Sequence, residues 1–315
     1  MTTELTKQSK RTYTIWTIAG AVALVALIGG LAQRSEADIV DAPNKVVSQN
    51  QAQAPRLDVV FTIDATGSMG DEIDVVKKEI WGIANKLMEG KPRPDIRFGL
   101  VFYQDRGDSF LVKKTDLTRN VDLVHKELMA ITAGGGGDWR EHVGRGLHEA
   151  VNMEWDSAQG VSRMIYLVGD APGHDDYQDG YDIASAIKTA RAKNIKINVI
   201  GCSGINDGRS EFESIAQNGG GAYTTLTYES VVTDEQGVRR SVIYYDGEMY
   251  EAEQVLEKGE WGRGADKLLG EGKLKKARPA MRRKAAAPGA ATRNNLDDVV
   301  LEGVKEEAAD MGVAY

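Results

Sequence analysis

Oxygen-bearing side chains and small residues alternate in the segment Asp64-Ala65-Thr66-Gly67-Ser68. Asp64 supplies a carboxylate, and Thr66 and Ser68 supply hydroxyls two and four positions later. Mg²⁺ and Ca²⁺ both take oxygen ligands, Mg²⁺ in near-octahedral geometry and Ca²⁺ with more ligands in looser geometry. Gly67 lets the backbone fold tightly around a small ion. We therefore predict a divalent cation at this loop; the alternative is that Asp64 only braces the loop.

Short apolar runs alternate with longer amphipathic ones over residues 56–228. Residues 57–63 are short and β-branched, which is typical of a buried strand, and residues 72–88 repeat apolar side chains at helical spacing. Further strands are expected at 96–103, 109–114, 163–168, 195–200 and 222–226, and further helices at 121–131, 141–153, 183–192 and 210–217. The alternation predicts an α/β fold, a doubly wound and mostly parallel sheet flanked by helices. Ligands of such sheets bind at the carboxyl ends of the strands.

Two more loops carry carboxylates in suitable places. Asp170 directly follows the strand expected at 163–168, and Asp138 lies in the glycine-rich loop 134–141. In their order along the chain, the three loops resemble the metal-ion-dependent adhesion site (MIDAS) of von Willebrand factor A (vWA) domains. The resemblance covers residues 56–228 and implies a Rossmann-like vWA fold. It also implies a ligand set of Asp64, Thr66, Ser68, Asp138 and Asp170.

The loops depart from the family pattern in two places. Thr66 replaces the usual Ser and keeps the hydroxyl, whereas Asp138 stands where many members have a metal-binding Thr. Three carboxylates on one divalent ion would leave a net charge of about −1, which disfavours a partner's carboxylate as the completing ligand. Capping of the helix that starts near Glu141 is the alternative role for Asp138. We expect Mg²⁺ as the cofactor, with Ca²⁺ or Mn²⁺ as alternatives.

Trp139 and His174 flank the expected metal loops and are candidates for a partner-binding rim. Trp139 could equally pack over its own loop. His174 lies close to Asp175, Asp176 and Asp179, so a second metal is conceivable there, although a solvated acidic loop is the favoured interpretation.

The N-terminal region contains an uncharged run at residues 13–32. A helix of this length spans about 30 Å, the thickness of the hydrocarbon core of a bilayer. Basic residues precede the run and acidic residues follow it, which predicts a cytoplasmic stub at residues 1–12 and an extracytoplasmic location for everything after the run. The chain thus resembles a bacterial, membrane-anchored vWA protein of the cell envelope, facing the periplasm or the cell surface.

A cleavable signal peptide is the competing interpretation of the same run, because Gly30 and Ala32 are small residues at a plausible cleavage spacing. The mature chain would then be secreted. Residues 33–55 are polar and lack a helical period, so we expect a linker.

Residues 229–315 are expected to form a C-terminal extension. Asp246-Gly247 predicts the turn of a β-hairpin. Helices are expected at 251–269 and 296–311, and the basic residues of 273–284 followed by an Ala-rich stretch are typical of a flexible, solvated tail.

Composition limits the function classes. Acidic residues outnumber basic ones by 47 to 39, a net charge of −8, which argues against nucleic-acid binding. Cys202 is the single cysteine, so no intrachain disulfide can form. The chain lacks a Gly-x-Ser-x-Gly elbow, a His-Glu-x-x-His motif and a phosphate-binding Gly-x-x-x-x-Gly-Lys loop.

We therefore expect a binding module rather than an enzyme, with no small-molecule substrate. The metal would bridge to a protein partner, and the N-terminal helix would tether the module to the membrane. Two alternatives remain open: a metal-assisted hydrolase that uses the same carboxylates, and a structural scaffold that acts through residues 229–315.

Overall fold

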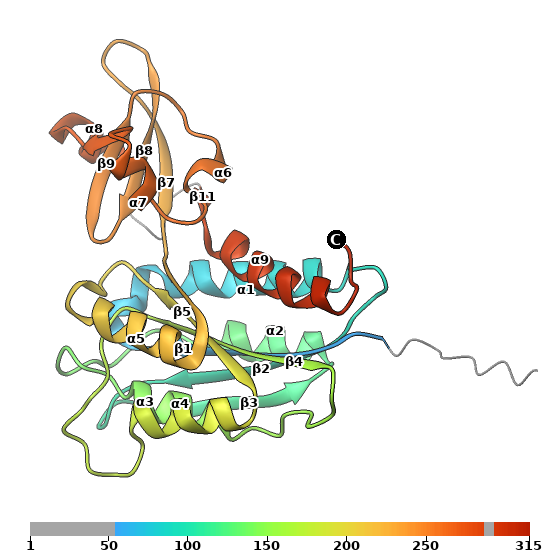
Figure 1. The fold of residues 1–315 in the computed structure, drawn as a ribbon. Coiled ribbons are helices and arrows are strands. Elements are labelled where there is room, and N and C mark those ends of the chain that lie inside the picture. The colour runs from blue at the N-terminus through green and yellow to red at the C-terminus, as the bar shows by residue number, and fades with distance from the viewer. Residues whose placement is uncertain (1–53, 287–292) are drawn as a thin grey trace, which may run out of the picture. The chain divides into compact units, whose positions relative to one another are not determined.

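A computed structural model describes residues 54–286 and 293–315 (Figure 1). The expected stub (1–12), the membrane segment (13–32) and nearly all of the linker (33–55) lie outside the described residues. Among the helices within the described ranges, none is long and apolar enough to cross a membrane.

A six-stranded sheet forms the centre of the α/β layer, in the order β3-β2-β1-β4-β5-β6 (Figure 1). All strands pair in parallel except β3, which is antiparallel to β2. The strands are β1 (Arg56–Asp64), β2 (Asp95–Tyr103), β3 (Val112–Thr118), β4 (Val161–Gly169), β5 (Ile195–Gly201) and β6 (Gly220–Thr225). The prediction of a mostly parallel α/β sheet is confirmed.

Helices cover both faces of this sheet. Phe61 and Ile63 of β1 join one apolar core and Val60 joins the other, because successive side chains of a strand point to opposite faces. The first core is closed by α1 (Ile73–Leu87), α2 (Val121–Ala130) and α9 (Leu296–Asp310). The second is closed by α3 (Val143–Val151), α4 (Ile183–Ala192) and α5 (Arg209–Gly219). β1 is buried on both sides, which explains its nearly continuous apolar sequence.

The chain reverses its winding direction at β1, which lies between β2 and β4. Asp64 is the last residue of β1, and Asp170 directly follows β4. The two carboxylates therefore lie at the carboxyl ends of neighbouring parallel strands, where open α/β sheets bind their ligands.

A second, antiparallel sheet has the order β10-β9-β8-β7-β11. Its strands are β7 (Tyr228–Thr233), β8 (Arg239–Tyr245), β9 (Glu248–Ala252), β10 (Leu274–Lys276) and β11 (Arg293–Asn294), with short helices α6 (Lys258–Trp261), α7 (Asp266–Gly270) and α8 (Pro279–Lys284). The chain then returns to the α/β layer, because α9 packs on α1 and contributes Val300 and Val304 to the first core. Residues 228–294 are thus an insertion between β6 and α9, not a terminal extension.

The ends of the insertion meet. The Asn295 side chain accepts a hydrogen bond from the Thr227 backbone N–H at 2.8 Å, and the Asn295 backbone N–H donates to the Thr227 carbonyl at 3.2 Å. Asn295 is fully buried. The residues that lead into and out of the insertion are therefore hydrogen-bonded to each other; this pair, Thr227 and Asn295, is called the neck below.

Within the insertion, the expected hairpin coincides with β8 and β9, and Asp246 and Gly247 adopt the positive φ values of 51° and 75° that its turn requires. The prediction of one helix at residues 251–269 is wrong, because this segment begins in β9 and then forms the two short helices α6 and α7. Its apolar residues pack against the second sheet instead of along one helix face, with Trp261 fully buried.

The basic stretch 273–284 also differs from the expected solvated tail. It contains β10, which pairs with β9, and α8, whose Met281 is buried. Its lysines and arginines are exposed, although the segment contains a strand and a helix. A basic, polar sequence is compatible both with such a segment and with a solvated tail.

Candidate metal centre

Four of the five predicted ligands form one connected set. Asp64 Oδ1 accepts hydrogen bonds from the Thr66 backbone N–H at 2.9 Å and from Thr66 Oγ1 at 2.7 Å. Thr66 Oγ1 lies 3.2 Å from Ser68 Oγ, and Ser68 Oγ donates to Asp170 Oδ1 at 3.0 Å. Two carboxylates and two hydroxyls from the β1 and β4 loops are thus gathered at one point, as the sequence predicted.

The glycine-rich loop lies directly over this set. A Cβ atom at Gly67 would stand 2.6 Å from the carbonyl oxygen of Gly135, so only glycine allows the two loops to approach this closely. Gly135 has a φ of 80°, and the Gly136 N–H donates to both carboxylate oxygens of Asp108 at 3.0 Å. The Gln104 side-chain amide donates to the Ala65 carbonyl at 2.7 Å and also to that of Gly134, which ties the loops after β1 and β2 to the glycine-rich loop.

Glu141 is a member of the centre that the sequence did not single out. It is 2% exposed, and its Oε2 atom is buried without a hydrogen-bond partner within the described residues. A Cβ atom at Gly136 would lie 3.6 Å from Glu141 Oε1 and 3.9 Å from the Thr66 Cβ. The signal that could have found it is the second carboxylate of the glycine-rich loop, two residues before α3.

The centre concentrates negative charge in a buried place. Burial, followed by the neighbouring Asp170 carboxylate, raises the pKa of Asp64 from 3.8 to about 7. Burial, followed by Asp64, raises the pKa of Glu141 from 4.5 to about 9. Both pKa values are thus raised mainly by burial and by neighbouring carboxylates, which oppose ionisation of Asp64 and Glu141.

These features fit a hard divalent cation. Asp64 Oδ2 is buried without a hydrogen-bond partner within the described residues, as is Glu141 Oε2. A buried carboxylate oxygen without a donor is costly unless a cation neutralises it. Asp64, Thr66, Ser68, Asp170 and Glu141 would offer oxygen atoms alone, the donor type that Mg²⁺ and Ca²⁺ take.

Asp138 lies elsewhere. Its side chain is 62% exposed, and its Oδ1 atom lies 3.7 Å from His174 Nε2. Within the described residues, the group of potential ligand atoms that lie within 4.8 Å of one another comprises Asp105, Asp138 and His174. The capping alternative also fails, because α3 has His142 at its N-cap position and no side-chain cap. The family resemblance placed Asp138 in the Asp64 set by its position in the glycine-rich loop, but its side chain lies in the cluster with Asp105 and His174.

The two predicted rim residues differ in exposure. Trp139 is 43% exposed, so its ring is accessible beside the glycine-rich loop. The His174 side chain is only 5% exposed and stacks on Tyr177 with ring centroids 3.9 Å apart. His174 is therefore an internal member of the loop cluster and not an exposed rim contact.

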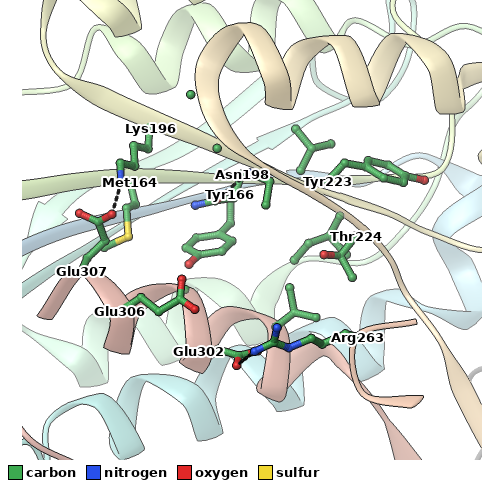
Figure 2. A pocket seen from close by; sticks show the side chains of 17 residues that line it. Met164, Tyr166, Lys196, Asn198, Tyr223, Thr224, Arg263, Glu302, Glu306 and Glu307 are labelled. Carbon is green, nitrogen blue, oxygen red and sulfur yellow. Dashed lines mark hydrogen bonds and ion pairs between the residues drawn. The ribbon is translucent and has the colours of Figure 1, made fainter. Parts of the chain in front are cut away.

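A separate pocket of about 480 Å³ lies between strands β4–β6 and α9 (Figure 2). Four of its charged lining residues form ion pairs, Lys196 with Glu307 and Arg263 with Glu302. None of the metal-centre residues lines it. The pocket adds nothing to the chemistry at Asp64.

The fold and the site together define the class: a doubly wound α/β domain with an oxygen-only, acidic centre at its switch point. A family model described as von Willebrand factor A domain matches residues 58–232, more than half of the chain. The chain therefore belongs to the vWA domain family.

Individual relatives match only in part. The Dictyostelium discoideum protein named alpha-protein kinase vwkA is 30% identical over 124 residues, 38% of this chain and 19% of that protein. Proximal thread matrix protein 1 of the mussel byssus is 20% identical, with TM-scores of 0.42 and 0.43 in two structures, one titled with a zinc-occupied MIDAS motif. These matches cover 55% of this chain and 42% of the mussel protein. The chain thus spans about a fifth of the length of the kinase and less than half of the mussel protein.

Proposed function

We propose that this vWA domain holds one divalent cation, Mg²⁺ by preference, and uses it to bind a protein partner. The ligands in this proposal are Asp64, Thr66, Ser68 and Asp170, with Glu141 in the role that the sequence gave to Asp138. Ca²⁺ and Mn²⁺ are the alternative ions, because both accept oxygen ligands.

The observation that carries this proposal is the buried Asp64 carboxylate, whose Oδ2 atom has no hydrogen-bond partner within the described residues. The Asp170 carboxylate accepts a hydrogen bond from Ser68, and the buried Glu141 carboxylate lies beside Thr66, where both Glu141 and Thr66 would contact a Cβ atom at Gly136. A set of this kind is destabilised when it is ionised and empty, and a cation removes that cost.

The partner would complete the coordination of the ion. Three carboxylates outweigh a divalent charge by about one, so a neutral oxygen donor of the partner is electrostatically more favourable than a carboxylate. Trp139, exposed beside the glycine-rich loop, offers an aromatic contact at the rim.

The setting is part of the proposal. The uncharged run at residues 13–32 anchors the chain in a membrane, as in a bacterial envelope protein, with the vWA domain on the extracytoplasmic side. Cleavage of the run as a signal peptide would instead release the domain. We propose a binding role without enzymatic activity, because the Thr66 and Ser68 hydroxyls and their carboxylate acceptors would all be engaged as ligands of the ion.

Partner capture tests the proposal. The full-length chain, solubilised in mild detergent and immobilised, is exposed to an envelope extract in Mg²⁺ and then washed with EDTA. We expect a partner that is retained in Mg²⁺, released by EDTA and lost with Asp64→Ala. Asp116→Ala, which removes an exposed carboxylate of β3, serves as the matched control. Capture that is unchanged by Asp64→Ala would contradict the proposal.

A scaffold that acts through the insertion is the second candidate, since residues 228–294 build their own sheet with two apolar clusters. Deleting residues 229–315 would also remove α9 from the core of the α/β layer. The informative variant therefore replaces residues 228–294 by a short Gly-Ser linker, which the hydrogen-bonded neck at Thr227 and Asn295 permits. Partner loss in this variant, with Asp64→Ala harmless, would favour the scaffold.

A further inference from the structure

Three loops at the carboxyl end of the sheet bring Asp105, Asp138 and His174 together. Asp105 follows β2, Asp138 precedes α3, and His174 follows β4. We propose that these three side chains, called the histidine site below, bind a transition-metal ion, Zn²⁺ in particular, separately from the oxygen-only centre at Asp64. The inference does not depend on the proposed function, because no side chain is shared between the two ligand sets.

The spacing of the ligand atoms suits a small ion. His174 Nε2 lies 3.5 Å from Asp105 Oδ2 and 3.7 Å from Asp138 Oδ1. Zn²⁺ binds nitrogen and oxygen ligands at 2.0–2.2 Å, so two of its tetrahedral ligands stand about 3.3 Å apart. These two separations would need to contract by a few tenths of an ångström, and the ligand atoms of Asp105 and Asp138 lie within 4.8 Å of each other.

The imidazole is already oriented. His174 Nδ1–H donates to Asp176 Oδ1 at 2.7 Å, and this contact fixes the ring with Nε2 on the side of Asp105 and Asp138. Metal-binding histidines commonly have such a carboxylate on the other ring nitrogen. The ring also stacks on Tyr177 at an interplanar angle of 6°. Backbone hydrogen bonds from Glu141 N to Pro172 O and from His174 N to Glu141 O fix the loop that carries it.

Asp105 supplies an independent indication of a ligand. It is only 6% exposed, and its Oδ1 atom is buried without a hydrogen-bond partner within the described residues. The other oxygen, Oδ2, accepts a hydrogen bond from the Tyr177 hydroxyl at 2.8 Å, which orients the carboxylate. Carboxylates that bind metals are commonly held in place by a hydrogen bond to one oxygen, while the other oxygen needs a cation or a donor to offset its burial. Asp105 has this arrangement.

The donor types select the ion. Imidazole nitrogen with carboxylate oxygen suits Zn²⁺, whereas Mg²⁺ takes oxygen ligands and keeps several waters. The Arg140 carbonyl oxygen accepts a hydrogen bond from His174 Nε2–H at 3.1 Å; zinc would replace this proton and leave the carbonyl beside the ion as a further oxygen donor. Asp138 is exposed, so one side of the histidine site is open to water or to a partner's ligand.

Zinc calorimetry on the full-length chain, prepared without a polyhistidine tag and in saturating Mg²⁺, tests the inference. We expect one zinc ion per chain, with affinity reduced at least tenfold by Asp138→Asn and by His174→Phe, which preserves the ring stacking. Asp138→Asn changes an exposed residue and should leave the fold intact. Asp175→Asn, at a 79% exposed neighbour, is the control and should bind zinc as the wild type does.

Asp64→Asn separates the two centres, since zinc binding at the histidine site should survive it. Three results would overturn the inference: no zinc binding by the folded chain, unchanged binding in both site variants, or binding that is lost with Asp64→Asn and retained with Asp138→Asn.

Discussion

The substitution Asp64→Asn measures how much the ionised Asp64 carboxylate destabilises the folded protein in the absence of metal. Burial and Asp170 raise the pKa of Asp64 from 3.8 to about 7. Between these two values the unfolded chain has released the proton and the folded chain retains it. The free energy of unfolding of the metal-free protein therefore falls as the pH rises through this window, and the penalty is constant above it. An increase of about three in the pKa corresponds to about 4 kcal/mol at high pH.

At pH 5 the same penalty is only about 2 kcal/mol. The folded chain still holds the proton at this pH, and pH 5 lies only about one unit above the pKa at which the unfolded chain releases it. Asparagine keeps an oxygen that can accept from Thr66 and carries no charge. Its buried amide would cost about 1–3 kcal/mol if unpaired, and this cost is the same at both pH values. The change in unfolding free energy caused by the substitution should therefore be about 2–3 kcal/mol more favourable at pH 8 than at pH 5.

Urea unfolding in EDTA at the two pH values provides the assay. Asp116→Asn, at an exposed carboxylate, is the control and should shift the unfolding free energy by less than about 0.5 kcal/mol at either pH. An effect of Asp64→Asn that is the same at pH 5 and pH 8 would refute the claim that burial and the neighbouring Asp170 carboxylate penalise the ionised form of Asp64.

Three further predictions concern the same centre. Glu141→Gln should weaken Mg²⁺ binding at least tenfold by calorimetry, while Asp138→Asn should leave it within about twofold; the reverse order would restore Asp138 to the ligand set. Gly67→Ala should destabilise the protein by about 1–3 kcal/mol in urea unfolding, because its Cβ would meet the Gly135 carbonyl at 2.6 Å. Gly70 has open space where a Cβ atom would stand, so Gly70→Ala should leave the free energy of unfolding nearly unchanged. Equal destabilisation by the two substitutions would contradict a role for the Gly67–Gly135 contact. Mg²⁺ at a hundred times its dissociation constant should raise the free energy of unfolding by about 2.7 kcal/mol, and a melting temperature independent of Mg²⁺ would count against binding to the folded state.

Much of the centre could be predicted because its determinants are local. Asp64, Thr66 and Ser68 lie within five residues at the end of an apolar strand, and Asp170 follows another such strand. Strand ends of a parallel sheet meet at one edge, so the sequence alone brings these side chains together.

The choice between Asp138 and Glu141 could not be made from the sequence. Both lie in the same loop, three residues apart, and the path of that loop depends on the positive φ of Gly135 and on its contact with Gly67. These are tertiary features that leave no periodic pattern. The approach of Asp105 to His174 likewise joins loops far apart in the chain.

The same limit applies to the insertion. The amphipathic pattern at residues 296–311 predicts a helix but not the surface on which it packs. Asn295 and Thr227 return the chain to the α/β layer through contacts 68 residues apart, which no local pattern reveals.

The central claim is that the oxygen-only centre binds a divalent cation. A calorimetric titration of the folded, full-length chain with Mg²⁺, repeated with Asp64→Asn, tests it most directly. We predict one Mg²⁺ per wild-type chain and no binding by the variant. No binding by the wild type, or binding that Asp64→Asn leaves unchanged, would contradict the claim.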